Sequence, residues 1–277
     1  MTQKITHISE IAGCYDAVVF DQWGVLHNGS TPYPGAVGAV EELRKAGQPL
    51  AVLSNSGKRA ANNAERIEKF GFGNVFDVVM TSGEALWRGF DEGKFSQTRL
   101  FPIQETVGDA ASWAEGLDLC FTNINQAEAV LLMGLSDGST ETAFADELDD
   151  ALSQGLPLYC SNPDKMSPRA GGHTVIAPGR LAHAYQNKGG NVAFFGKPHQ
   201  PVFDALRHEL KTSKILMVGD SLEHDVAGGA NAGWDTLLVQ GGLYRAAFDH
   251  QNADTVLSSL CQKHGAPLPT FRMKTLS

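Results

Sequence analysis

Short runs of consecutive apolar residues alternate along the chain with longer stretches in which apolar residues recur every three or four positions. The runs at 17–20 and 50–53 contain no polar residue, which is typical of strands buried on both faces of a sheet. The stretch 34–46 begins at a proline, has apolar residues at threefold spacing and ends before Gly47, so it predicts a helix. Further strands are predicted at 75–80, 156–160, 192–195, 215–218 and 236–239, and further helices at 58–70, 140–154, 180–187, 200–211 and 223–231.

The order strand, helix, strand predicts an α/β fold, because short connections of this kind join parallel strands through right-handed crossovers. The alternation is clear before residue 81 and again after 190, but it is less regular between these points. We therefore expect a Rossmann-like parallel-sheet core made of 1–81 and 190–277, interrupted by an inserted α/β domain at 82–189.

The residues that follow the predicted strands carry the candidate chemistry. Asp21, Ser54, Lys197 and Asp220 each come at or within two residues of a strand end, and Asp225 lies five positions after Asp220. Ligands of open parallel sheets bind outside the carboxyl ends of the strands. A single aspartate after a strand is more often a helix cap, but four such strand ends together indicate one site.

Composition limits the classes of function that this site can serve. The chain has 22 basic and 31 acidic residues and a net charge of −9, so it lacks the overall basic charge of a nucleic-acid binder. An anionic substrate then needs local cations or a metal. The four cysteines form no metal-binding pair and are typical of a reducing compartment. We see no signal peptide and no membrane span, and expect a cytoplasmic protein.

The motifs around these residues resemble those of the haloacid dehalogenase-like superfamily. The matching segments are Phe-Asp-x-x-Gly-Val at 20–25, Leu-Ser-Asn at 53–55, Gly-Lys-Pro at 196–198 and Gly-Asp-Ser-x-x-x-Asp at 219–225. The resemblance implies that Asp21 is a nucleophile that forms an aspartyl-phosphate, that Ser54 and Lys197 bind the transferring phosphoryl group, and that Asp220 holds Mg²⁺.

The chemistry of these residue types agrees with such roles. A carboxylate can attack phosphorus once a metal and an ammonium offset the repulsion between anions. Mg²⁺ prefers oxygen ligands and usually takes one or two carboxylates from the protein, which Asp21 and Asp220 would supply, with the backbone carbonyl of Trp23 as a third oxygen. Asp225 would orient Asp220 or a metal-bound water; the alternative is a simple helix N-terminal charge.

The spacing of the motifs resembles one subfamily, class IIA. Ser54 follows Asp21 by 33 positions, which leaves no room for a domain, whereas Lys197 follows Ser54 by 143 positions. In class IIA the cap domain lies in this second gap. The resemblance also implies that Asn162 and Asp164, in an Asn-Pro-Asp segment, face the substrate together with Asn55; the alternative is an ordinary turn.

One position departs from the phosphatase pattern. Phosphatases of the family carry an acid/base aspartate two residues after the nucleophile, and this chain has Trp23 there. An indole offers only an N–H donor, and general acid–base catalysis contributes roughly 10²–10⁴ in rate. His27, His173 and Asp164 are candidate replacements. Otherwise, the leaving group must depart without protonation, or turnover is weak.

These observations predict an Mg²⁺-dependent hydrolase that acts on a small phosphate ester or acyl phosphate of a phosphorylated metabolite. Two alternatives stay open: a phosphate-binding protein without catalysis and, because dehalogenases also carry an aromatic residue at this position, a carbon–halogen hydrolase. Neither a nucleic-acid nor a membrane partner is expected, and the sequence leaves the oligomeric state open between a monomer and a homodimer.

Overall fold

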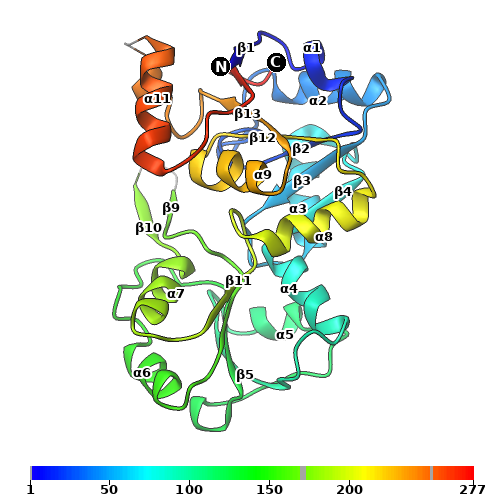
Figure 1. Ribbon diagram of the computed structural model, residues 1–277. Coiled ribbons are helices and arrows are strands. Elements are labelled where there is room, and N and C mark those ends of the chain that lie inside the picture. The colour runs from blue at the N-terminus through cyan, green and yellow to red at the C-terminus, as the bar shows by residue number, and fades with distance from the viewer. Residues whose placement is uncertain (1, 169–172, 250–251) are drawn as a thin grey trace. The chain divides into compact units, whose positions relative to one another are not determined.

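The computed structural model describes residues 2–168, 173–249 and 252–277, which form two compact units (Figure 1). The first unit comprises 1–54, 63–80 and 197–277, and the second comprises 55–62 and 81–196. Among the described residues, no helix is long and apolar enough to cross a membrane.

A seven-stranded sheet forms the centre of the first unit, in the order β1-β14-β13-β12-β2-β3-β4. The ladders from β1 through β3 are parallel. Every side chain of the central strands β2, β3 and β12 is buried, which explains why these strands are continuous apolar runs. The strands are β1 (Gln3–Lys4), β2 (Ala17–Phe20), β3 (Leu50–Ser54), β4 (Val78–Thr81), β12 (Ile215–Gly219), β13 (Asp235–Val239) and β14 (Phe271–Met273).

The longer helices of this unit bury an apolar face, as α2 illustrates. In α2 (Ala36–Lys45) the buried residues include Val40 and Leu43, which join the core cluster that also contains Phe20 of β2. The other helical elements are α1 (Ser9–Ala12), α3 (Ala60–Ile67), the π-helical turns η1 (Glu68–Phe72) and η3 (Leu222–Ala227), α8 (Gln200–Leu210), α9 (Gly228–Asn231), α10 (Arg245–Phe248) and α11 (Ala253–His264).

The second unit has its own five-stranded parallel sheet, in the order β11-β8-β7-β5-β6. Its strands are β5 (Arg99–Ile103), β6 (Cys120–Phe121), β7 (Ala129–Leu132), β8 (Leu158–Cys160) and β11 (Val192–Phe194), and an antiparallel ribbon is formed by β9 (Met166–Pro168) and β10 (Thr174–Ile176). The helices are α4 (Ser82–Asp91), α5 (Asp109–Trp113), the 3₁₀ turn η2 (Ile124–Gln126), α6 (Ala145–Ser153) and α7 (Pro178–Asn187).

The structure confirms the predicted α/β architecture and the strands at 17–20, 50–53, 215–218 and 236–239. It differs at β11, which was expected in the core sheet but pairs with β8 in the second unit. The two units therefore divide between Gly196 and Lys197, whereas the glycine pair at 189–190 only ends α7. The predicted helix at 140–154 starts later, at Ala145, because Phe144 has a left-handed backbone with φ of 60°.

Candidate active site

Asp21 lies at the carboxyl edge of the first unit's sheet, directly after the central strand β2. Its neighbour β12 ends in register with β2, with Val218 opposite Phe20, so Asp21 and Asp220 emerge side by side. The backbone N–H of Asp21 donates to the Val218 carbonyl at 2.9 Å and continues this ladder past the strand end. Ser54 is the last residue of β3 on the other side of β2 and is buried. Three adjacent strands thus deliver three of the predicted residues to one edge.

Lys197 joins two of the carboxylates. Its Nζ lies 2.7 Å from Oδ1 of Asp21 and 2.7 Å from Oδ1 of Asp225, and the side chain is only 2% exposed. Burial alone would lower the pKa of this ammonium, but Asp21 and Asp225 outweigh burial and raise the pKa above its ordinary value. Lys197 is therefore a fixed positive charge beside the Asp21 carboxylate.

Asp225 is held in place by backbone groups as well as by Lys197. Its Oδ2 accepts the N–H groups of Asp220 at 3.1 Å and Ser221 at 3.0 Å, while its Oδ1 accepts from Lys197. The side chain is 1% exposed. Ser221 caps the turn η3 by accepting the N–H of His224. Since both oxygens of Asp225 are engaged, this residue orients Asp220 and Lys197 and is poorly placed to be a direct metal ligand.

The carboxylate of Asp220 is packed between two glycines. A Cβ on Gly24 would lie 1.8 Å from Asp220 Oδ2, and a Cβ on Gly242 would lie 2.2 Å from the same atom. The N–H of Leu243 donates to Oδ2 at 2.7 Å, whereas Oδ1 has no hydrogen-bond partner in the part of the chain that the structure describes. The packing holds this carboxylate in one orientation and leaves one oxygen for a ligand.

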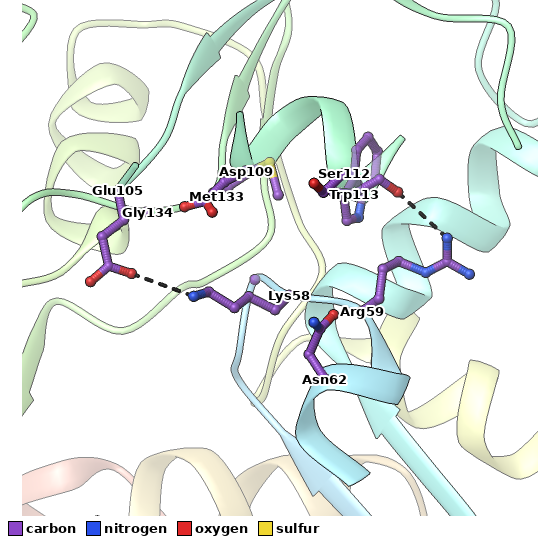
Figure 2. A pocket seen from close by; sticks show the side chains of 10 residues that line it. Lys58, Arg59, Asn62, Glu105, Asp109, Ser112, Trp113, Met133 and Gly134 are labelled. Atoms are coloured by element: carbon purple, nitrogen blue, oxygen red, sulfur yellow. Dashed lines mark hydrogen bonds and ion pairs between the residues drawn. The ribbon is translucent and has the colours of Figure 1, made fainter. Parts of the chain in front are cut away.

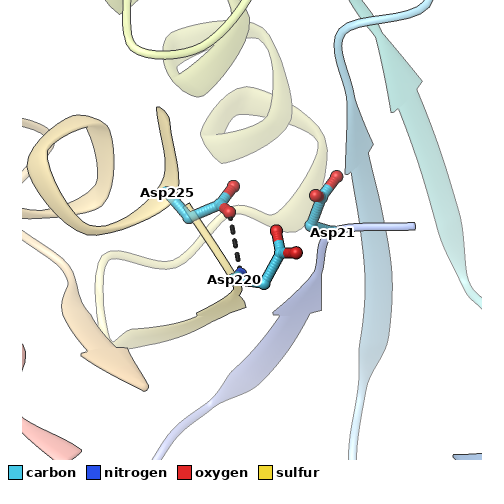
Figure 3. Close-up of side chains that lie close together, drawn as sticks. All are labelled: Asp21, Asp220 and Asp225. Carbon is cyan, nitrogen blue, oxygen red and sulfur yellow. Dashed lines mark hydrogen bonds between the residues drawn. The ribbon is translucent and has the colours of Figure 1, made fainter. Parts of the chain in front are cut away.

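The three aspartates form an acidic cluster, in which Asp220 and Asp225 are buried and Asp21 is partly buried; their side chains lie close together in Figure 3. One oxygen of each lies within 4.8 Å of the others. Burial, partly offset by Lys197 and reinforced by Asp225, raises the pKa of Asp21 to about 6. Burial, together with the charges of Asp21 and Asp225, also raises the pKa of Asp220 well above its usual value. Three carboxylates and one ammonium carry a net charge of −2 when all are ionised.

A divalent cation fits this cluster in both charge and ligand chemistry. One ion of charge +2 would cancel the net −2, and the free oxygen of Asp220 with a carboxylate oxygen of Asp21 is the type of ligand set that Mg²⁺ takes. The tight approach of Gly24 to Asp220 brings the Trp23–Gly24 peptide to the same place, which is consistent with the predicted role of the Trp23 carbonyl.

The flap, residues 23–31, contains no carboxylate that could serve as general acid, and its one histidine is His27. The indole is 37% exposed, and its Nε1 edge packs on Gly29, where a Cβ would lie 2.8 Å from Nε1. His27 is 1% exposed, accepts the Gly29 N–H on Nδ1 at 3.0 Å and places Nε2 3.5 Å from Oε1 of Gln22. Burial, with a contribution from Arg66, lowers the pKa of His27 to about 4. His27 is therefore a neutral structural residue at pH 7, which argues against it as the replacement acid.

The remaining predicted residues lie in the second unit. The Asn55 amide donates to Asp164 Oδ1 at 2.7 Å, although the two residues are 109 positions apart. Asn162 Oδ1 accepts the Asp164 N–H at 3.1 Å, so the Asn-Pro-Asp segment does form the turn that was one of the two alternatives. His173 is also in this unit and is exposed. Asn55, Asn162 and Asp164 thus form one hydrogen-bonded group within the second unit.

The sequence did not predict the roles of several contributors to the site, although Gly24 itself stands in the motif at 20–25. Gly24, Gly242 and the N–H of Leu243 fix Asp220, and all three act through the backbone. The positive φ of Gly24, +88°, is the only local property that marks it. The glycine pair at 241–242 follows the end of a strand, and such a pair indicates a place where the backbone approaches another group closely.

Comparison with known proteins agrees with this geometry. The family model for haloacid dehalogenase-like hydrolases matches residues 18–113, and a second model, for HAD-hydrolase-like proteins, matches 194–262. Chronophin of Bos taurus is 26% identical over 85% of this chain and 84% of its own length. Human glycerol-3-phosphate phosphatase is 26% identical over 82% of this chain and 79% of its own length. A crystal structure of a haloacid dehalogenase-like hydrolase from Brucella suis has a TM-score of 0.83 and 27% identity, and covers 99% of this chain and 100% of its own.

The sheet, the strand-end cluster and these matches define the class of the protein: the chain belongs to the haloacid dehalogenase-like hydrolases. Its relatives include proteins named as phosphatases, among them glycerol-3-phosphate phosphatase. It is a phosphatase of the class IIA type, as the spacing of the motifs predicted.

Proposed function

We propose that this chain hydrolyses small phosphate monoesters and acyl phosphates in an Mg²⁺-dependent reaction through a phosphorylated Asp21. The observation that supports this most directly is the buried cluster in which one lysine joins Asp21 to Asp225 and the net charge is −2. Phosphatase relatives support the substrate class. Four free thiols, of which Cys160 and Cys261 are buried, support a reducing compartment such as the cytoplasm.

In the first step, a carboxylate oxygen of Asp21 attacks phosphorus, and the bond from phosphorus to the leaving oxygen breaks. Asp21 must be ionised to attack, and with a pKa of about 6 it is largely ionised at pH 7 even without a metal. Lys197 stays protonated and stabilises the charge on the phosphoryl oxygens, with the Ser54 hydroxyl as a second donor. When bound, Mg²⁺ would supply the positive charge that offsets the carboxylates and the phosphoryl group.

In the second step, water attacks the phosphorus of the aspartyl-phosphate, which releases phosphate and regenerates the Asp21 carboxylate. Neither Trp23 nor His27 can exchange the necessary protons, because one is an indole and the other is neutral, buried and hydrogen-bonded. The leaving oxygen therefore departs without a proton from this flap. Aryl and acyl phosphates, whose leaving groups are weak bases, are accordingly the favoured substrates.

The second unit completes the proposal as the cap domain that class IIA enzymes carry at this point of the chain. Asn55, Asn162 and Asp164 are the proposed substrate-binding residues of this unit. The hydrogen bond between Asn55 and Asp164 and the turn at Asn162 support a preformed arrangement of these side chains.

The test is hydrolysis of p-nitrophenyl phosphate and acetyl phosphate with Mg²⁺ and with a chelator. We expect turnover only with Mg²⁺, loss of at least ~10³-fold in Asp21→Asn, and little change in Asp204→Asn, a matched control at an exposed carboxylate on α8. Absence of turnover with retained phosphate binding would favour the non-catalytic alternative. Chloride release from chloroacetate, unaffected by chelator, would favour the carbon–halogen hydrolase.

A further inference from the structure

A cavity of about 190 Å³ opens within the second unit, and none of the residues assigned to the acidic cluster lines it (Figure 2). Glu105, two positions after β5, and the Met133–Gly134 segment, directly after β7, form one side of it. The loop at 57–59 with Asn62 and the helix α5 supply the rest of the lining. All of these residues belong to the second unit.

The position of this cavity in the sheet is the one where open parallel sheets bind ligands. The strand order is β11-β8-β7-β5-β6, so the chain runs from β5 to β6 on one side and then returns to place β7, β8 and β11 on the other. The reversal lies between β5 and β7. The crevice outside the carboxyl ends of the two strands at such a reversal is the general ligand site of this architecture.

The cavity wall is built by close backbone approaches. A Cβ on Gly57 would lie 2.5 Å from the Met133 carbonyl oxygen, and a Cβ on Gly134 would lie 3.0 Å from the Glu105 nitrogen. Arg59 forms part of the cavity wall. Its Nε donates to Glu84 at 2.7 Å, and its guanidinium lies 3.8 Å from the centroid of the Trp87 ring. The Arg59 charge is therefore already balanced and the wall is rigid.

Apart from Arg59, the charged side chains that line the cavity are Lys58, Glu105 and Asp109. Figure 2 shows Lys58 reaching toward Glu105, with Nζ 3.9 Å from Oε2; the two side chains are 56% and 45% exposed. A long, exposed pair of this kind is weak and can be exchanged for contacts to a ligand. Asp109 uses one oxygen to accept the Thr106 N–H at 3.0 Å, which leaves the other.

Two neutral polar side chains at the cavity also have no intramolecular partner. The Asn62 amide and the Ser112 hydroxyl line the cavity, and neither makes a hydrogen bond with any residue that the structure describes. Both residues are exposed, so a ligand with donors and acceptors would replace water at these groups. The volume limits the size of the ligand, because about 190 Å³ is below the ~300–1,000 Å³ of drug-sized sites.

We propose that this cavity binds a small zwitterionic amine of the α-amino-acid type. Its carboxylate would pair with Lys58, and its ammonium with Glu105 and Asp109, so that one ligand of opposite charges replaces the weak Lys58–Glu105 pair. The site lies beyond the proposed phosphatase function and uses none of its catalytic residues. Its test is a binding measurement that requires no turnover.

Calorimetric titration of the full chain with L-alanine, L-serine and L-aspartate tests the proposal, beside L-alaninamide, which lacks the carboxylate, and L-lactate, which lacks the ammonium. We expect saturable binding of at least one amino acid and at least tenfold weaker binding of both single-charge analogues. Lys58→Met and Glu105→Gln should each weaken binding at least tenfold. Lys94→Met is the matched control, since Lys94 is an exposed lysine of the same unit that pairs with Glu92, and it should bind as the parent does.

Two results would overturn the proposal. One is that no amino acid binds at up to ~20 mM, a concentration at which a millimolar Kd is still detectable as a shift in stability. The other is binding that Lys58→Met and Glu105→Gln leave unchanged, which would place the ligand elsewhere. If a variant fails to fold by circular dichroism, the comparison of zwitterion and single-charge analogues on the parent protein decides by itself.

Discussion

The buried acidic cluster should make the metal-free protein less stable as the pH rises, and Asp21→Asn isolates this effect. The pKa of Asp21 is about 6 in the folded chain, against ~3.9 in an unfolded chain. The folded state therefore binds this proton more tightly. The stabilisation is fully present below about pH 4 and is lost as the pH rises through about 6. At ~1.36 kcal/mol per pKa unit, the whole effect is about 3 kcal/mol, of which about 2 kcal/mol falls between pH ~4.5 and ~7.5.

Urea unfolding in chelator at these two pH values measures the effect, with the free energy of unfolding of Asp21→Asn subtracted at each pH. The subtraction removes groups whose surroundings are the same in both proteins. One of these is His27, whose lowered pKa makes stability fall as the pH drops from about 6.5 toward about 4. The part of the raised Asp220 pKa that the Asp21 charge causes stays in the difference and acts in the same direction. We expect the parent to lose about 2 kcal/mol relative to the variant as the pH rises, and Mg²⁺ to restore it at pH ~7.5. A difference between the two proteins that does not change with pH would refute the reasoning.

Three further predictions concern the same site. Asp220→Ala should abolish the rise in melting temperature that Mg²⁺ gives the parent, because the free oxygen of Asp220 is lost; an equal rise in both proteins would place the ion elsewhere. Trp23→Asp should accelerate alkyl phosphates more than aryl phosphates, since only poor leaving groups need a proton; a flat dependence on leaving-group pKa in the parent would show that another acid exists. Gly24→Ala should reduce activity at least ~10-fold, because its Cβ would lie 1.8 Å from Asp220 Oδ2. The control Gly47→Ala has a similar φ of +79° and nothing within 4 Å, so it should cost only the ~1–2 kcal/mol of backbone strain and leave activity intact.

The acidic cluster could be predicted because the carboxyl ends of parallel strands meet at one edge. Asp21 and Asp220 follow two strands that pair directly, and Lys197 and Asp225 reach the same edge from the segments that follow β11 and β12. A continuous apolar run predicted each of these strands. The apolar runs therefore predicted the central strands, and the meeting of their carboxyl ends predicted the site.

Other features depend on contacts between segments that are distant in the sequence. The helix α4 was not predicted, since the pattern after residue 81 is less regular. A Cβ at Gly83 would lie 2.1 Å from the Gly57 carbonyl oxygen, so close packing requires the glycine there. The predicted helix at 223–231 is instead the turn η3 followed by α9. The Asp225 carboxylate accepts two backbone N–H groups at the start of this segment, and no periodicity reveals that.

The partner of β11 was also beyond the sequence pattern. A short apolar run predicts a strand but not the sheet that it joins, and β11 pairs with β8 rather than with the core sheet. For the same reason, the burial of His27 against Phe70, with 4.4 Å between ring centroids, could not be foreseen, and this histidine remained a candidate acid until its surroundings were known.

The central claim is that Asp21 carries the phosphoryl group during turnover. Acid quenching of the protein mixed with acetyl phosphate and Mg²⁺, followed by peptide mass spectrometry, tests it most directly. The account predicts one added phosphoryl group on the peptide that contains Asp21, at a position labile to hydroxylamine, and none in Asp21→Asn. Phosphate release with no modification of Asp21 at any quench time, or the same modification on another residue, would contradict it.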